Sequence, residues 1–115
     1  MFRETQLAWA GGYVNTLVGD SAAETAVSAA LDLYPANAYQ PRENLEMMRA
    51  ATLVQRREVD AGLNHALGIV TDAHSVGPSA ARNIITQRIL RAVPADQRNH
   101  PAARDLRAIT RGVVI

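Results

Sequence analysis

The chain has 115 residues, of which 48% are apolar, and its formal net charge at pH 7 is +1. This length fits a single helical domain over residues 1–115, with a modest core that copies of the chain could extend by packing together. The absence of cysteine excludes disulfides and thiolate metal sites. No stretch approaches the roughly 20 apolar residues of a membrane span, and the N-terminus lacks a signal-peptide pattern. We therefore expect a protein of the cytoplasm or of a soluble particle.

The first predicted helix spans residues 4–18, where apolar residues recur at helical spacing. Gly11 and Gly12 lie in its middle, and two adjacent glycines cost about 2 kcal/mol relative to alanines in a helix. The segment is therefore expected either to kink there or to form when packed against another element. Gly19 is expected to end it.

The second predicted helix spans residues 21–33 and opens with a capping box, in which the side chains of Ser21 and Glu24 accept each other's backbone N–H groups. Its apolar positions are mostly alanine and form one narrow stripe, which suits close helix packing. Pro35 ends it.

The third predicted helix, residues 42–74, is the longest and forms the centre of the expected fold. Pro41 suits its first position because that position needs no backbone donor. Glu43 and Glu46 would then lie in its first turn, where the helix dipole favours carboxylates. The glycines that either admit a neighbouring backbone or divide this helix in two are Gly62 and Gly68.

A break at residues 75–79 separates this helix from a fourth, which Pro94 ends. A short fifth helix is predicted from Pro101 to Gly112, followed by residues 113–115 as a strand-like or plug segment. The sequence thus predicts an all-α fold of four to five helices. Such a fold would be a helical bundle or an extended helical hairpin completed by contacts in an oligomer.

The sequence lacks the patterns of catalytic, nucleotide-binding and metal sites. Glu58, His65 and Asp72 share one helix face, but successive members are about 10 Å apart along the axis, too far to hold one ion. The dipole of the predicted central helix accounts for Glu43 and Glu46 without a catalytic role. We therefore expect no catalytic residue, no metal, no cofactor and no small-molecule substrate, and hence no enzyme.

Charge is distributed unevenly along the chain. All twelve basic residues are arginine. Residues 1–74 carry five arginines and nine acidic residues, whereas residues 75–115 carry seven arginines and two acidic residues. The Arg-rich part could bind phosphates, meet the acidic part of another copy, or remain a solvated face. The candidate contact residues for a protein or nucleic-acid partner are Arg82, Arg88, Arg91, Arg98, Arg104, Arg107 and Arg111.

These observations favour a non-enzymatic structural or assembly protein that packs against copies of itself or other subunits. A virion or another large particle is one setting for such a protein. One alternative is a helical protein that binds nucleic acid through the Arg-rich part. Another is a small adaptor or inhibitor that docks one helix in the groove of a partner.

Overall fold

The computed structural model describes residues 2–19, 22–72 and 80–114, and the side chains of 4–16, 19, 22–72 and 80–109. Every regular element in this part of the chain is helical, which confirms the predicted all-α class there. The elements are α1 (Phe2–Val18), α2 (Ala23–Leu33), α3 (Tyr39–Gln55), α4 (Val59–Val70), α5 (Ala80–Ala92), the 3-10 turn η1 (Ala95–Gln97) and α6 (Pro101–Val114).

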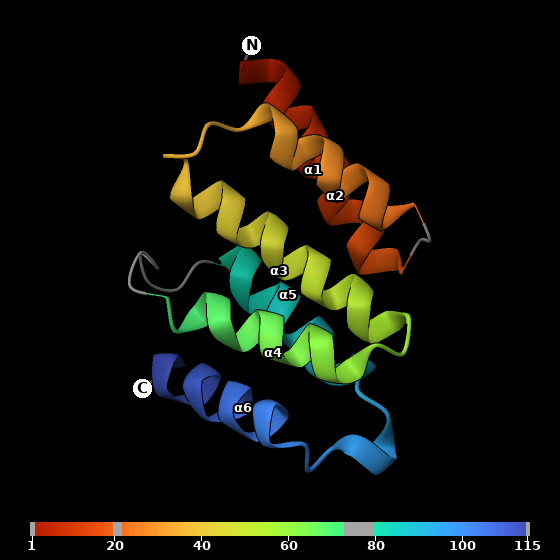
Figure 1. Ribbon diagram of the computed structural model, residues 1–115. Coiled ribbons are helices and arrows are strands. Elements are labelled where there is room, and N and C mark those ends of the chain that lie inside the picture. Colours follow the sequence, from red (N-terminus) through yellow and green to blue (C-terminus); the bar gives the residue numbers. More distant parts are fainter. Residues whose placement is uncertain (1, 20–21, 73–79, 115) are drawn as a thin grey trace.

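Helix α3 organises the fold, because it contacts α1, α2, α4 and α5. Figure 1 shows α1 and α2 side by side at one end of the molecule, α3 across the middle, α4 and α5 beyond it, and α6 at the opposite end. The molecule measures 43 × 30 × 19 Å along its principal axes. The first and last helices therefore face solvent at opposite ends.

The core consists of aliphatic and methionine side chains from α2 to α6, as the sparse aromatic content predicts. Burying a side chain of this size contributes about 1.5–3 kcal/mol to stability. Trp9 and Tyr13 of α1 stack with ring centroids 5.1 Å apart and pack against the edge of this core. The largest core side chains with no exposed surface are Leu45, Met47, Met48, Leu63, Ile85, Ile89 and Leu106.

Helix α1 runs unbroken through its two glycines, so the predicted helix forms without ending there. A Cβ atom at Gly12 would lie 3.3 Å from Cγ2 of Val27 and 3.6 Å from Sδ of Met48. This close approach to α2 and α3 supplies the packing that offsets the low helix propensity of glycine. Gly19 follows the helix with φ +73°, which confirms it as the end of the segment.

The prediction of one central helix over residues 42–74 is wrong. Two helices, α3 and α4, occupy this region, and the chain turns between them at residues 56–58. Neither Gly62 nor Gly68 divides the segment, because both lie inside α4. Gly62 instead lets α4 approach α3, since a Cβ there would lie 2.8 Å from the carbonyl oxygen of Ala50.

A Schellman motif produces this turn. Arg57 adopts a left-handed conformation, with φ 71°. Its backbone N–H donates to the carbonyl of Val54 at 3.0 Å, and the N–H of Glu58 donates to the carbonyl of Leu53 at 2.9 Å. Both bonds satisfy carbonyl groups that the end of a helix leaves unpaired. Glycine usually occupies the left-handed position, and arginine there leaves the turn without its usual sequence signal.

The start of α3 also differs from the prediction. The helix begins at Tyr39, so Pro41 is its third residue rather than its first. The proline is tolerated because the first four N–H groups of a helix have no intrahelical partner. No acidic residue lies in the first turn, so dipole complementation does not account for Glu43 and Glu46.

The start of α2 and the end of α6 also bear on the predicted helix boundaries. Ala22 precedes α2 and makes no side-chain cap; the predicted capping box rests on Ser21, which lies outside the described residues. Helix α6 starts at Pro101 as predicted but continues to Val114. The strand-like interpretation is therefore wrong for residues 113–114, which extend the last helix. The plug interpretation depends on side chains outside the described part.

Candidate functional surfaces

The predicted arginine surface is not one surface, because Arg82 lies inside the fold. Its Nη1 atom is 3.5 Å from Oε2 of Glu43 on α3, and the two side chains are only 9% and 14% exposed. Arg82, which the sequence analysis names as a candidate contact residue, is therefore not part of an exposed arginine surface. Its hydroxyl neighbour Thr86 is also buried and donates to the Arg82 carbonyl at 2.7 Å. Arg82 thus joins α5 to α3.

Arg88 and Arg91 lie elsewhere, beside the C-terminal ends of two other helices. With Gly19 after α1 and Gln55 at the end of α3, they line a hollow of about 270 Å³. The C-terminal end of a helix carries partial negative charge and favours a nearby cation. Arg88 and Arg91 therefore lie where the partial negative charge of two helix ends favours a cation. Arg91 is also exposed to solvent.

A third group of arginines lies at the end of the molecule formed by η1 and α6. Arg98 and Arg104 are exposed. Nη2 of Arg107 donates to the carbonyl oxygen of Arg98 at 2.6 Å, which ties α6 to the preceding turn. Arg111 is in α6, but its side chain lies outside the described part. Arg104, Arg107 and Arg111 share one helix face by their spacing.

The most exposed large apolar residues that the structure describes are on α1. Leu7 is 64% exposed and Val14 is 56% exposed. Ala10 and Gly11 lie between them on the same side of the helix and are also exposed. Outside the backbone of α1 itself, no described atom lies within 4 Å of the Cβ position at Gly11, so no described element covers this side. We call Leu7, Ala10, Gly11 and Val14 the α1 face.

Helix α2 packs along α1 and adds exposed uncharged residues, which are Thr25, Ala29 and Leu33. The acidic Glu24 of this helix instead forms an ion pair with Arg56 at the end of α3.

The sequence contained the signal for the α1 face. Helix α1 has apolar residues on both sides, and such a helix normally has partners on both sides.

A polar cluster joins α2, α3 and α4. Nη1 of Arg49 donates to Oε1 of Glu46 at 2.8 Å, and Nη2 of Arg49 donates to the hydroxyl of Ser28 at 3.4 Å. Nε2 of His65 lies 3.4 Å from Oε2 of Glu46. The nearby His65 imidazole lowers the pKa of Glu46, and the charge on Arg49 lowers it further, whereas partial burial acts in the opposite direction. Glu46 is thereby held ionised as a cross-link between helices.

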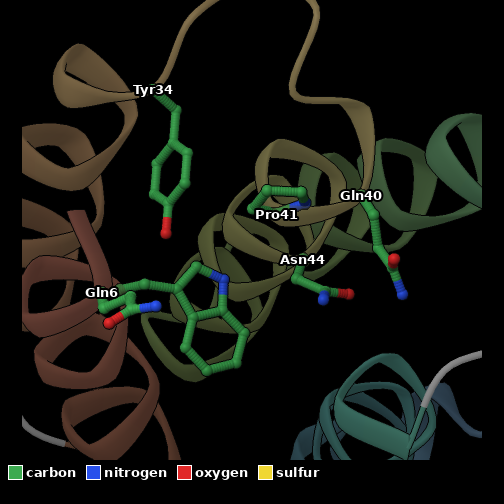
Figure 2. Close-up of a pocket in the computed structure, with 6 residues that line it drawn as sticks. Gln6, Tyr34, Gln40, Pro41 and Asn44 are labelled. Carbon is green, nitrogen blue, oxygen red and sulfur yellow. The ribbon is translucent and has the colours of Figure 1, made fainter. Parts of the chain in front are cut away.

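A separate hollow of about 290 Å³ lies between α1, the end of α2 and the start of α3. The described residues of its lining are aromatic, proline and amide residues, and none of them is charged. Figure 2 shows Gln6, Tyr34, Gln40, Pro41 and Asn44 around it. Tyr34 closes one side, since its hydroxyl donates to the carbonyl oxygen of Thr5 at 3.2 Å. Sequence reasoning missed this hollow because its residues come from three separate segments.

Within residues 2–19, 22–72 and 80–114, no group of three or more histidine or acidic residues is placed to hold a metal ion. No helix in these ranges is long and apolar enough to cross a membrane. Comparisons with protein-family models, curated proteins and solved structures found no match to the chain.

Proposed function

We propose that this chain is a non-enzymatic assembly protein that packs against a second copy of itself through the α1 face. The observation that carries the proposal is the exposure of Leu7 and Val14 on a helix whose other side is already packed against α2 and α3. Exposed apolar groups of this kind gain about 25 cal/mol for each Å² removed from water. A partner that covers them is therefore favoured.

The pattern of the α1 face suits a second copy in an antiparallel arrangement. Leu7 and Val14 lie at equal distances in sequence from the centre at Ala10 and Gly11. A two-fold axis through that centre would place Leu7 against Val14 of the second copy, and the small central residues would let the two helices approach closely. The four positions carry no charge, so neither like-charge repulsion nor desolvation of a charge opposes the contact.

Substitution of Leu7 tests this contact. The Leu7→Glu variant should reduce the mass measured by light scattering to that of the monomer, because a buried unpaired carboxylate opposes pairing. The matched control is Ile84→Glu, which changes a 48% exposed apolar residue on α5. This control should keep the mass of the unmodified protein. An equal effect of both variants, or of neither, would contradict a specific α1 contact.

A larger particle, such as a virion shell, needs a second contact on each copy. Arg98 and Arg104 supply candidate residues, because α6 lies at the end of the molecule opposite α1 (Figure 1). These arginines could meet exposed carboxylates such as Asp32 on another copy. Such a contact would weaken as salt rises, whereas the apolar contact would not.

Binding of nucleic acid is the second candidate function, and the exposure of Arg91, Arg98 and Arg104 favours it. Phosphate contacts would make the affinity fall steeply with salt. An Arg98→Ala, Arg104→Ala double variant should then bind single- and double-stranded DNA and RNA more weakly. The control is Arg56→Ala, which removes an exposed arginine engaged with Glu24. Unchanged affinity in the double variant would exclude this role.

A further inference from the structure

The hollow lined by Trp9 and Asn44 contains one buried polar atom without a hydrogen-bond partner among the described residues. The Nε1 atom of Trp9 is out of reach of solvent and has no hydrogen-bond partner among the described residues. Asn44, which also lines the hollow, is only 6% exposed. Buried polar groups in folded proteins are nearly always paired with protein, water or a ligand. Trp9 and Asn44 line the same hollow of about 290 Å³.

The chemistry of the lining defines what fits. Among the side chains that the structure describes, none that lines the hollow is charged, so a charged ligand would lose its hydration without compensation from them. Trp9, Tyr34 and Pro41 offer ring surfaces, which favour a flat apolar body. The volume lies at the lower end of ligand pockets, which typically hold about 300–1,000 Å³, so the ligand should be a single small ring.

The polar groups define the edge of that ring. An indole N–H only donates, so the ligand must present an acceptor. The carboxamide of Asn44 carries a donor and an acceptor side by side, and the amides of Gln6 and Gln40 lie at the rim. A carboxamide is matched by a neighbouring acceptor and donor, as when asparagine or glutamine reads the edge of a base. A cyclic amide presents both groups in one plane.

We propose that this hollow binds an uncharged planar heterocycle with adjacent C=O and N–H groups, the edge that a pyrimidine base presents. The site is distinct from the proposed self-contact, because Trp9 points to the other side of α1 from Leu7 and Val14 by its position on the helix. Binding here and assembly there can therefore fail independently.

Titration of the full chain with uracil tests the proposal. Trp9 is the only tryptophan in the sequence, so its fluorescence reports on this hollow alone. We expect a saturable change with uracil and binding about ten-fold weaker with 1,3-dimethyluracil, which keeps the ring and carbonyl groups but lacks the N–H donors. Methyl glucoside, a hydroxyl-bearing ring without an amide edge, should give no saturable change.

Variants locate the binding. Asn44→Leu should weaken uracil binding about ten-fold, by the loss of hydrogen bonds. Because Asn44 is buried, Gln40→Leu at the exposed rim is a second variant that does not disturb the core, and it should weaken binding roughly three-fold. The control Asn64→Leu changes an exposed asparagine on α4 and should bind uracil as the unmodified chain does.

Four results would overturn the proposal. No saturable change up to the solubility limit of uracil would mean that water alone fills the hollow. Equal binding of uracil and 1,3-dimethyluracil, or equal binding by the Gln40→Leu variant and the unmodified chain, would remove the amide edge as the recognised feature. Saturable binding of methyl glucoside without binding of uracil would assign the hollow to a hydroxyl-bearing ring instead.

Discussion

Arg82 of α5 and Glu43 of α3 form an ion pair that is almost entirely buried, with Nη1 and Oε2 3.5 Å apart. The pair crosses the interface between the central helix and α5. Removing one partner from a buried pair leaves a charge that water cannot reach. Glu43→Gln should therefore lower the free energy of unfolding by about 3 kcal/mol, measured by urea denaturation.

The surface pair of Glu24 and Arg56 provides the control for this prediction. Glu24→Gln is the same chemical change at a position open to solvent, and it should cost at most about 1 kcal/mol. Similar losses in the two variants would show that burial of the Arg82 pair does not govern its contribution.

Gly62 and Gly68 on α4 give a second comparison. A Cβ at Gly62 would lie 2.5 Å from Cγ2 of Val54 and 2.8 Å from the carbonyl oxygen of Ala50. Gly62→Ala should therefore force α3 and α4 apart and cost about 1–3 kcal/mol. Gly68 has no atom within 4 Å of its Cβ position, and Gly68→Ala should stabilise the helix by about 0.5–1 kcal/mol. Thermal unfolding of both variants should move in opposite directions.

Arg57 carries the left-handed turn between α3 and α4, with φ 71°. This conformation costs a residue with a Cβ about 1–2 kcal/mol. Glycine avoids that cost, but it also gains entropy in the unfolded chain, which offsets part of the benefit. Arg57→Gly should therefore raise the free energy of unfolding by less than about 1 kcal/mol. Arg57→Val, with a branched Cβ in the same conformation, should be clearly destabilising. A stable Arg57→Val variant would contradict the left-handed turn.

Acid should weaken the protein partly through Glu46. Interaction with His65, followed by the charge on Arg49, lowers the pKa of Glu46 from its ordinary value of 4.5. A carboxyl whose pKa is lower in the folded state contributes stability above the ordinary pKa, and this contribution is lost as pH falls through the folded pKa. Denaturant unfolding should therefore show a smaller loss of stability below pH 4.5 in Glu46→Gln than in the unmodified protein. An identical pH dependence in Glu46→Gln and the unmodified protein would contradict the lowered pKa of Glu46.

The sequence predicts the helical class and several helix ends because those features have local causes. Gly19 takes a positive φ and Pro101 starts a helix, as their residue types indicate. The break after α3 escapes prediction because Arg57, rather than glycine, occupies the left-handed position. The start of α3 is misplaced because proline is tolerated anywhere in the first helical turn.

The candidate surfaces depend on tertiary contacts that a single sequence does not contain. Arginine is usually exposed, so the burial of Arg82 against Glu43 could not be read from the sequence around it. For the α1 face, the sequence indicates that α1 needs more than one partner, since Leu7 and Val14 belong to a helix with apolar residues on both sides. Which of those sides remains open depends on where α2 and α3 pack.

The absolute mass of the purified chain, measured by light scattering over a range of concentrations at low and high salt, tests the proposed self-association most directly. Contact through Leu7 and Val14 predicts a discrete mass of at least two chains that persists at high salt, because apolar contacts are not screened. A mass of 12.4 kDa, that of one chain, at every concentration and in both salts would contradict it.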